Sequence, residues 1–251
     1  MATGFPDLLA AEWLKARTGR LWWLLALVGG FLVLVSNLGL LSQGVEQLDA
    51  GTTTLAELTD VPVRNSMAML LPAALFGAVF VTREYTGGTI GRSALLSGGR
   101  DRQWAAKLLV SLAAGALFGL FALVLGIGSA WALLAGHGHA PLWTGETWLI
   151  ALGVFAVNVL GAAWGVFLGW ILRKDMVAVA ALVLLVLGVE PALHRFVPEV
   201  GKYFLTVAMS SVYRDTQPDL LPIPFACLVI AAWLAAAGYL ARRLVRSRDL
   251  T

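Results

Sequence analysis

Long apolar runs alternate with short polar stretches along this chain, and six of the runs approach the length of a membrane span. A helix satisfies its own backbone hydrogen bonds in lipid, and about 20 apolar residues cross a hydrocarbon core about 30 Å thick. The pattern therefore predicts an all-α integral membrane protein, a single transmembrane domain over 1–251 with six transmembrane helices. The predicted spans are 22–41, 66–82, 108–135, 148–172, 176–193 and 221–241.

The segment before the first span has its own helical pattern. Phe5, Leu8, Leu9, Trp13 and Ala16 recur at the spacing of one helix face, and the charged residues of this segment lie mostly elsewhere on the helix. This pattern is typical of a short helix that lies in the membrane interface. The alternative is a plain extension of the first span.

Two polar segments between spans are long enough to carry structure. The cytoplasmic segment 83–107 mixes charge with glycine and short apolar pieces, and it is the candidate docking and coupling surface. The segment 194–221 is too polar to cross the membrane but contains Tyr203, Phe204 and Met209. We expect it to fold back into the outer leaflet as a re-entrant-like loop, covered by protein or facing a water-filled cavity.

Composition and charge place the chain in a membrane and orient it. Hydrophobic residues make up 59% of the chain and charged residues 13%, whereas soluble domains carry about 25% charge. Fourteen of the eighteen Lys and Arg residues flank the spans on one side, which predicts that this side and both termini are cytoplasmic. Because these residues flank spans and do not line one exposed face, we exclude nucleic acid as a partner.

Catalytic and metal-binding patterns are absent or weak in the sequence. The glycine-dense stretch Gly87, Gly88 and Gly91 lacks the spacing of a phosphate-binding loop, so we expect no cofactor on this chain and any ATP on a partner. No aspartate pair, His-Glu-x-x-His helix or Gly-x-Ser-x-Gly elbow occurs in the spans. His137 and His139 alone make a weak metal site, so we predict no catalytic residue and no metal.

Few polar residues lie deep in the predicted spans. Asn37 and Asn158 are the main ones, and we consider them candidates for a substrate path, with an interhelical hydrogen bond as the alternative for Asn158. Glu190 lies near an outer end and could pair with Arg195 or Arg64. The near absence of charge at depth disfavours a proton-driven carrier.

Small residues recur every four positions on two spans. Gly161, Gly165 and Gly169 follow one another on the fourth span, and Gly115 and Gly119 on the third. This spacing lets helix backbones approach closely, so we expect these faces to pack against other helices of this chain or of a second copy.

Two motifs resemble those of a known family. Ala11-Glu12-Trp13-Leu14-Lys15-Ala16-Arg17 resembles the Ala-Glu-Trp-x-Lys-x-Arg start of bacterial ABC-2 type transporter permeases. Glu84-Tyr85-Thr86-Gly87-Gly88-Thr89-Ile90, followed by Leu95-Leu96-Ser97, Arg100 to Arg102 and Ala105-Ala106-Lys107, is similar to that family's Glu-Tyr-x-x-Gly-Thr-Ile…Ser-x-x-x-Arg…Ala-Lys signature. Gly98-Gly99 departs from it, since many members carry a proline just after the serine.

The resemblance implies a permease subunit of an ATP-binding cassette exporter in the bacterial inner membrane, with the ABC-2 (type V exporter-like) fold. Two cytosolic ATPase subunits would hold ATP and Mg, and a second permease copy or a similar chain would complete the complex within membrane lipid. The cargo would be amphipathic or hydrophobic: an antibiotic, a peptide or a lipid-like molecule. The implied ATPase-coupling residues are Glu12, Lys15, Arg83, Glu84, Tyr85, Gly88, Thr89, Arg92, Arg100, Arg102, Lys107, Arg173, Lys174 and Asp175.

Other interpretations stay open from the sequence. The chain could be a secondary carrier or channel that is not coupled to ATP, or a membrane scaffold or enzyme. For Glu84, the alternative to a coupling role is helix capping or pairing with Arg83 or Arg92.

Overall fold

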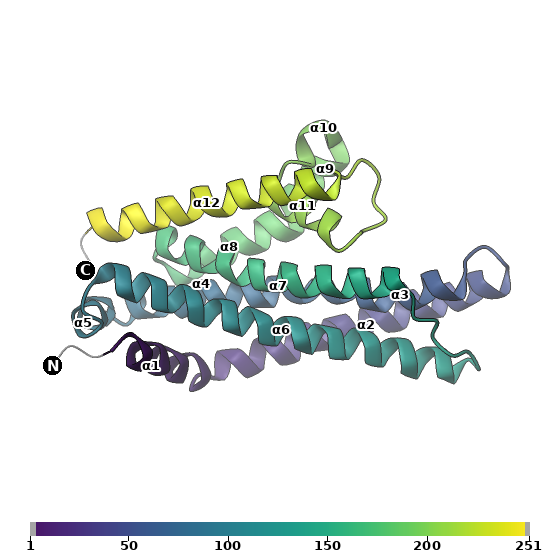
Figure 1. The fold of residues 1–251 in the computed structure, drawn as a ribbon, viewed down its shortest axis with the longest axis horizontal. Coiled ribbons are helices and arrows are strands. Elements are labelled where there is room, and N and C mark those ends of the chain that lie inside the picture. Colours follow the sequence, from purple (N-terminus) through teal and green to yellow (C-terminus); the bar gives the residue numbers. More distant parts are fainter. Residues whose placement is uncertain (1–3, 249–251) are drawn as a thin grey trace.

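The computed structural model describes residues 4–248, and every regular element in that range is helical (Figure 1). The elements are α1 (Phe5–Arg17), α2 (Arg20–Asp49), α3 (Leu55–Asn65), the 3-10 helix η1 (Ser66–Met69), α4 (Leu70–Thr86), α5 (Ile90–Leu96), α6 (Arg100–Gly136), α7 (Gly145–Leu172), α8 (Asp175–Val183), the π-helix η2 (Leu184–Val189), α9 (Glu190–Phe196), α10 (Pro198–Gly201), α11 (Leu205–Val212) and α12 (Ile223–Ser247).

The predicted all-helical fold with six spans is confirmed in length and composition. The helices that are long and apolar enough to cross a membrane are α2, the continuous run from α3 to α4, α6, α7, the run from α8 to α9, and α12. Five of them contain a predicted span, and α12 begins at Ile223, two residues after the start of the predicted span 221–241.

Several helices extend beyond the apolar runs that predicted them. The helical run that contains the second predicted span begins at Leu55, whereas the span was predicted to begin at residue 66. Thr54 and Glu57 form a reciprocal capping box that starts α3 in a polar region. Helix α6, which contains the third predicted span, begins at Arg100, whereas the span was predicted to begin at residue 108. Hydropathy marks the part of a helix that lies in lipid, whereas the helix itself continues into water wherever its end is capped.

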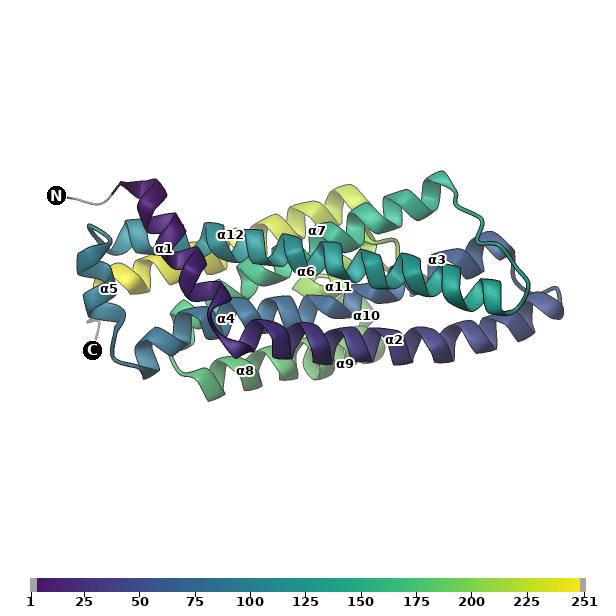
Figure 2. The ribbon, with the colours of Figure 1, turned by 90° about the horizontal axis from the view of Figure 1, so that it is seen from below.

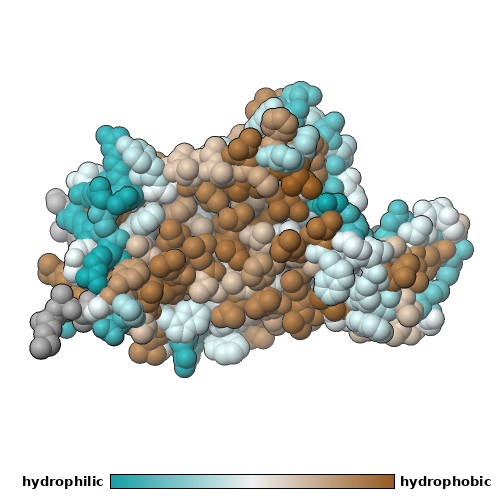
Figure 3. All heavy atoms as spheres, viewed as in Figure 1, coloured by the Kyte–Doolittle hydropathy of each residue, from teal (hydrophilic) through white to brown (hydrophobic). Residues whose placement is uncertain are grey.

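The polar residues gather at the two ends of the bundle and leave an apolar band between them (Figure 3). Both termini lie at the same end, together with α5 (Figures 1 and 2). The α2–α3 connection and the loop after α6 lie at the opposite end. Both termini lie at one end because the chain passes through the bundle an even number of times.

The glycine-rich faces pack within this chain. Gly161, Gly165 and Gly169 of α7 lie against α4, and a Cβ atom placed on Gly165 would collide with the backbone of Ala74. Gly115 and Gly119 of α6 lie against α7 in the same way. Helices α4 and α7 therefore form the closely packed centre of the bundle, and α2, α8 and α12 lie outside it.

Helix α1 is separate from α2. The chain bends at Thr18 and Gly19, and α1 then crosses the end of α6 obliquely (Figure 2). Leu8, Glu12 and Ala16, at intervals of four residues, form its buried face. The predicted separate N-terminal helix is therefore present, and the alternative, a plain extension of the first span, is wrong.

Short glycine turns delimit α5 at the end that carries the termini. After α4, Gly88 has a φ of 64°, and the N–H groups of Gly88 and Thr89 donate to the carbonyls of Tyr85 and Glu84. After α5, Gly98 has a φ of 74° and ends that helix with the same pair of hydrogen bonds. This Schellman geometry requires a left-handed residue, so glycine fixes both ends of the segment between α4 and α6.

The segment 194–221 folds back onto the spans as helices α10 and α11. Helix α11 packs against α7 and α12 (Figure 1), and its Leu205, Ala208 and Met209 are buried. Glu190 accepts hydrogen bonds from the N–H and the hydroxyl of Thr206, both at 2.6 Å, and so caps the start of α11. The expected pairing of Glu190 with Arg195 or Arg64 is wrong. Its carboxylate instead accepts hydrogen bonds from Thr206 in the first turn of α11.

Candidate functional site

Four charged side chains from three helices meet at the base of the bundle, the end that carries both termini. Nζ of Lys107 on α6 lies 2.9 Å from Oε2 of Glu12 on α1 and 3.0 Å from Oε1 of Glu84 on α4. Nζ of Lys15 lies 2.6 Å from Oε1 of Glu12 and 3.0 Å from Oε1 of Glu84. We call these four residues the basal charge cluster.

Three members of the basal charge cluster are buried, Lys15 is exposed at 44%, and both carboxylates are fully hydrogen-bonded. The Glu12 and Lys107 residues are fully buried, at 0% exposure, and Glu84 is nearly so. Gln103 donates to the remaining Oε2 of Glu84 at 3.0 Å, so all four carboxylate oxygens accept a hydrogen bond. The ammonium of Lys107 also lies 4.1 Å from the centre of the Phe80 ring. Each carboxylate oxygen is therefore held by a donor, although Oε1 of the buried Gln103 has no hydrogen-bond partner.

The electrostatics of the cluster keep its members on α1 charged. Burial alone would raise the pKa of Glu12, but the ammonium groups of Lys107 and Lys15 outweigh burial and hold that pKa below its ordinary value of 4.5. Partial burial would lower the pKa of Lys15, but the carboxylates of Glu12 and Glu84 raise it above 10.5. Opposite charges within about 4–6 Å have this effect on both partners.

Sequence motifs that are far apart converge in this cluster. Glu12 and Lys15 belong to the first motif, whereas Glu84 and Lys107 begin and end the second. Of the alternatives for Glu84, the pairing with Arg83 or Arg92 is wrong, because its carboxylate pairs with Lys15 and Lys107. Its role in coupling stays a prediction.

A second set of contacts ties the α7–α8 turn to neighbouring helices. The guanidinium of Arg173 lies 5.0 Å from the centre of the Tyr85 ring, and its Nη2 donates to the carbonyl of Leu244 at 3.0 Å. The hydroxyl of Thr86 donates to Oδ2 of Asp175 at 3.0 Å. The turn therefore connects the end of α4 with the end of α12.

The other predicted coupling residues lie at the same end but outside the basal charge cluster. Nη1 of Arg100 donates to the carbonyls of Val245, Arg246 and Arg248 at 2.9–3.1 Å, so it caps the end of α12. Arg102 is partly buried in the first turn of α6. The exposed members are Arg83, Gly88, Thr89, Arg92 and Lys174.

Sequence reasoning missed three residues that hold this end together. Gln103 and Phe80 complete the cluster, and Asp101 pairs with Arg242 and Arg246 of α12. Gln103 lies four residues before Lys107, on the same helix face, and this spacing is a signal that could have identified it.

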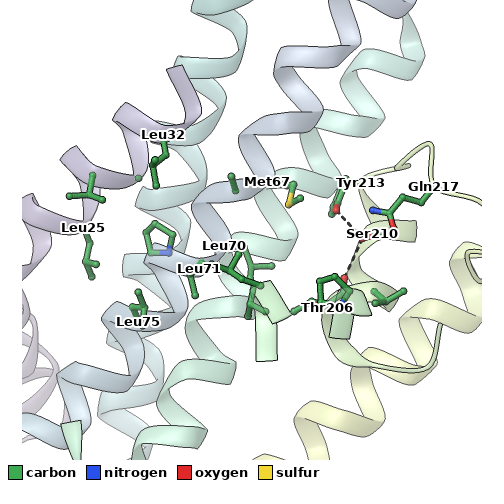
Figure 4. A pocket seen from close by; sticks show the side chains of 18 residues that line it. Leu25, Leu32, Met67, Leu70, Leu71, Leu75, Thr206, Ser210, Tyr213 and Gln217 are labelled. Atoms are coloured by element: carbon green, nitrogen blue, oxygen red, sulfur yellow. Dashed lines mark hydrogen bonds between the residues drawn. The ribbon is translucent and has the colours of Figure 1, made fainter. Parts of the chain in front are cut away.

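A mostly apolar cavity of about 350 Å³ lies away from the base, among α2, α4, η2 and α11. Leu25, Leu32, Leu71 and Leu75 line it from α2 and α4, and polar residues of α11 line the opposite wall (Figure 4).

Neither predicted asparagine lines this cavity. Oδ1 of Asn37 accepts from Nδ2 of Asn65 at 2.6 Å, and Asn37 is buried between α2 and α3. Asn158 is also fully buried, and its amide donates to the carbonyl of Val154 on its own helix at 2.8 Å. Both asparagine side chains are buried within or between helices in this conformation, and this position does not support a role in a substrate path.

The histidines of the loop after α6 also lack a built site. Nδ1 of His137 lies 2.8 Å from the carbonyl of Leu133. Within residues 4–248, no group of three or more His, Cys, Asp and Glu side chains comes together as metal ligands would.

The fold defines the class of the protein as an all-helical chain with six helices long and apolar enough to cross a membrane. No protein-family model matches the chain, and a search of curated proteins finds no match.

Proposed function

We propose that this chain is the membrane-spanning permease subunit of an ATP-binding cassette exporter, driven by a separate cytosolic ATPase. The basal charge cluster is the observation that carries the proposal. It joins α1, α4 and α6 at the end where both termini and most Lys and Arg residues lie, which is the end that charge asymmetry assigns to the cytosol.

The cluster supplies a route for mechanical force. Helix α5 connects α4 to α6 through two glycine turns, and the cluster attaches α1 to the same two helices. Because α1 and α5 are both attached to α4 and α6, a force applied to α1 or α5 moves α4 and α6 together. Because α4 packs closely on α7, the movement reaches the centre of the bundle.

The α7–α8 turn provides a second attachment. Arg173 and Asp175 connect this turn to Tyr85, Thr86 and α12, so the turn follows any movement of the end of α4. A partner that presses on the base contacts both attachments at once.

In the proposed complex, this chain supplies the membrane path and the partner supplies the energy. ATP and Mg bind the ATPase, two copies of which pair with this permease and a second copy or a similar chain. The complex lies in the bacterial inner membrane with both termini of this chain in the cytosol.

The test first searches the neighbouring reading frames for an ATPase with a complete phosphate-binding loop, and then measures ATP hydrolysis in lipid nanodiscs that contain this chain with and without that ATPase. We expect no hydrolysis by the chain alone and partner-dependent hydrolysis by the complex. Glu84→Gln preserves shape but removes one charge of the cluster, so it should separate hydrolysis from movement of the spans while the complex stays assembled. Substrate flux in nucleotide-free vesicles that contain this chain alone would overturn the proposal in favour of a carrier or channel.

A further inference from the structure

The cavity opens sideways toward the surface that faces lipid. Helix α4 packs against both α2 and α8 and forms the back wall, while η2 forms one edge. Val28 and Leu32 on the α2 edge and Leu187 on the η2 edge are at least half exposed. A molecule dissolved in the bilayer can therefore reach the cavity without passing through water. Its volume of about 350 Å³ falls within the roughly 300–1,000 Å³ range of small-molecule sites.

The lining of the cavity is divided into an apolar and a polar zone. Leucines of α2 and α4 face one side (Figure 4). Thr206, Ser210, Tyr213 and Gln217, on α11 and the segment after it, line the other side. We call these four residues the polar rim. Lipid tails alone would gain nothing from a row of hydroxyl and amide groups at this position, because they cannot form hydrogen bonds with it.

Most hydrogens of the polar rim are already used inside the protein. The hydroxyl of Thr206 donates to Glu190 at 2.6 Å, and the amide of Gln217 donates to Asp215 at 2.6 Å. The hydroxyls of Ser210 and Tyr213 lie 2.9 Å apart, and that of Tyr213 reaches Asp215 at 3.5 Å. Each hydroxyl has one hydrogen and two lone pairs, so the hydroxyls offer a ligand mainly acceptors, while Gln217 keeps its carbonyl oxygen and one N–H.

Two acidic side chains stand directly behind the polar rim. Glu190 is 2% exposed, and neither Glu190 nor Asp215 forms an ion pair with Lys or Arg in the described part of the chain. Of the arginines nearby, Arg214 pairs with Glu146, Nε of Arg64 donates to the carbonyl of Arg214, and Arg195 lies in the adjoining pocket and does not line this cavity. The rim therefore favours a donor with positive charge over an anion.

We infer that this cavity binds, from within the membrane, an amphiphile with an aliphatic body and an ammonium head group. The body fills the apolar zone, and the N–H groups donate to the polar rim. The idea that this amphiphile is the exported cargo rests on the proposed function. The idea that the cavity binds it rests on the cavity alone.

The test uses the full chain in phosphatidylcholine nanodiscs, without the ATPase. The probes are two photoactivatable C12 chains that differ only in the head group, one a primary amine and the other a carboxylate. Labelled peptides are mapped by mass spectrometry. We expect the amine to label η2 and α11 about tenfold more than the carboxylate, as one charge-assisted hydrogen bond predicts, and unlabelled decylamine to compete.

A matched pair of variants locates the binding. Leu187 in the cavity and Leu228 on the outer face of α12 are both 66% exposed. Leu187→Trp fills the mouth of the cavity and should abolish most amine labelling, whereas Leu228→Trp should leave it unchanged. Tyr213→Phe removes one acceptor and should reduce labelling by the amine but not by the carboxylate.

Two results would overturn the inference. Equal labelling by the two head groups would show a groove filled by ordinary lipid tails, and labelling that survives Leu187→Trp would place the amine elsewhere. Because these measurements need no ATPase, a negative result here leaves the coupling experiment intact. Conversely, selective amine binding together with failed ATPase coupling would keep the site and remove its role in export.

Discussion

Replacing Lys107 by methionine isolates the contribution of the basal charge cluster. Methionine keeps the unbranched shape of the buried side chain but removes its charge. Glu12 and Glu84 then share the single ammonium of Lys15, and two carboxylate oxygens lose a donor. Both Glu12 and Lys107 are fully buried, so water cannot replace the lost partner.

The expected effect is large enough to measure by thermal denaturation. Removing one partner of a buried ion pair costs about 3–5 kcal/mol. For a chain of this length each kcal/mol lowers Tm by about 2–4 °C, so Lys107→Met should lower Tm by about 6 °C or more. The assay is a thermal unfolding scan of the purified chain in nanodiscs, followed by tryptophan fluorescence.

Two further variants distinguish charge pairing from general damage. Glu12→Gln combined with Lys107→Met removes one charge of each sign, and we expect it to recover a large part of the lost Tm. Glu199→Gln breaks the exposed Glu199–Lys202 pair and should leave Tm unchanged. A double variant as unstable as Lys107→Met alone would refute the reasoning, because the loss would then come from packing.

Three other predictions test the cluster, the helix packing and the α11 cap. The folded-state pKa of Glu12 lies below 4.5, so the unfolded chain binds more protons than the folded chain in mild acid. The stability that the ionised Glu12 contributes is therefore present above pH 4.5 and lost as pH falls through the folded-state pKa. Glu12→Gln should remove this loss and flatten the acid limb of a curve of Tm against pH. Gly165→Ala should lower Tm because its Cβ meets the backbone of α4, whereas Gly128→Ala, with open space around it, should not. Glu190→Leu removes the acceptor for both donors of Thr206, so hydrogen exchange across α11 should accelerate while the spans stay protected; unchanged exchange would exclude the cap.

Much of the fold could be predicted because lipid restricts the choices. Only helices cross a bilayer with their backbone groups satisfied, so apolar runs identify the spans almost directly. Their ends could not be read in the same way: Thr54 with Glu57 starts a helix in a polar region where hydropathy gives no signal. The π-helix η2 was not predicted either, because its apolar residues fit an ordinary helical span equally well.

The candidate site was predictable in its members but not in its contacts. Motif positions placed Glu12, Lys15, Glu84 and Lys107 at one end of the bundle, because each lies just outside a span. Their pairing joins residues up to 95 positions apart, and no local rule selects Lys107 over Arg92 as the partner of Glu84. The cavity was not predictable either, since its walls come from six helical elements and look like any lipid-facing surface in the sequence.

The account requires that the end of the bundle with α1 and α5 faces the cytosol, where an ATPase can reach it. Leu95 on α5 is 84% exposed, and Leu95→Cys in a Cys227→Ser background places one reactive thiol there. A membrane-impermeant maleimide should label this cysteine in inside-out vesicles but not in intact cells. Labelling in intact cells would put the basal charge cluster on the outer side, away from ATP, and would contradict the account.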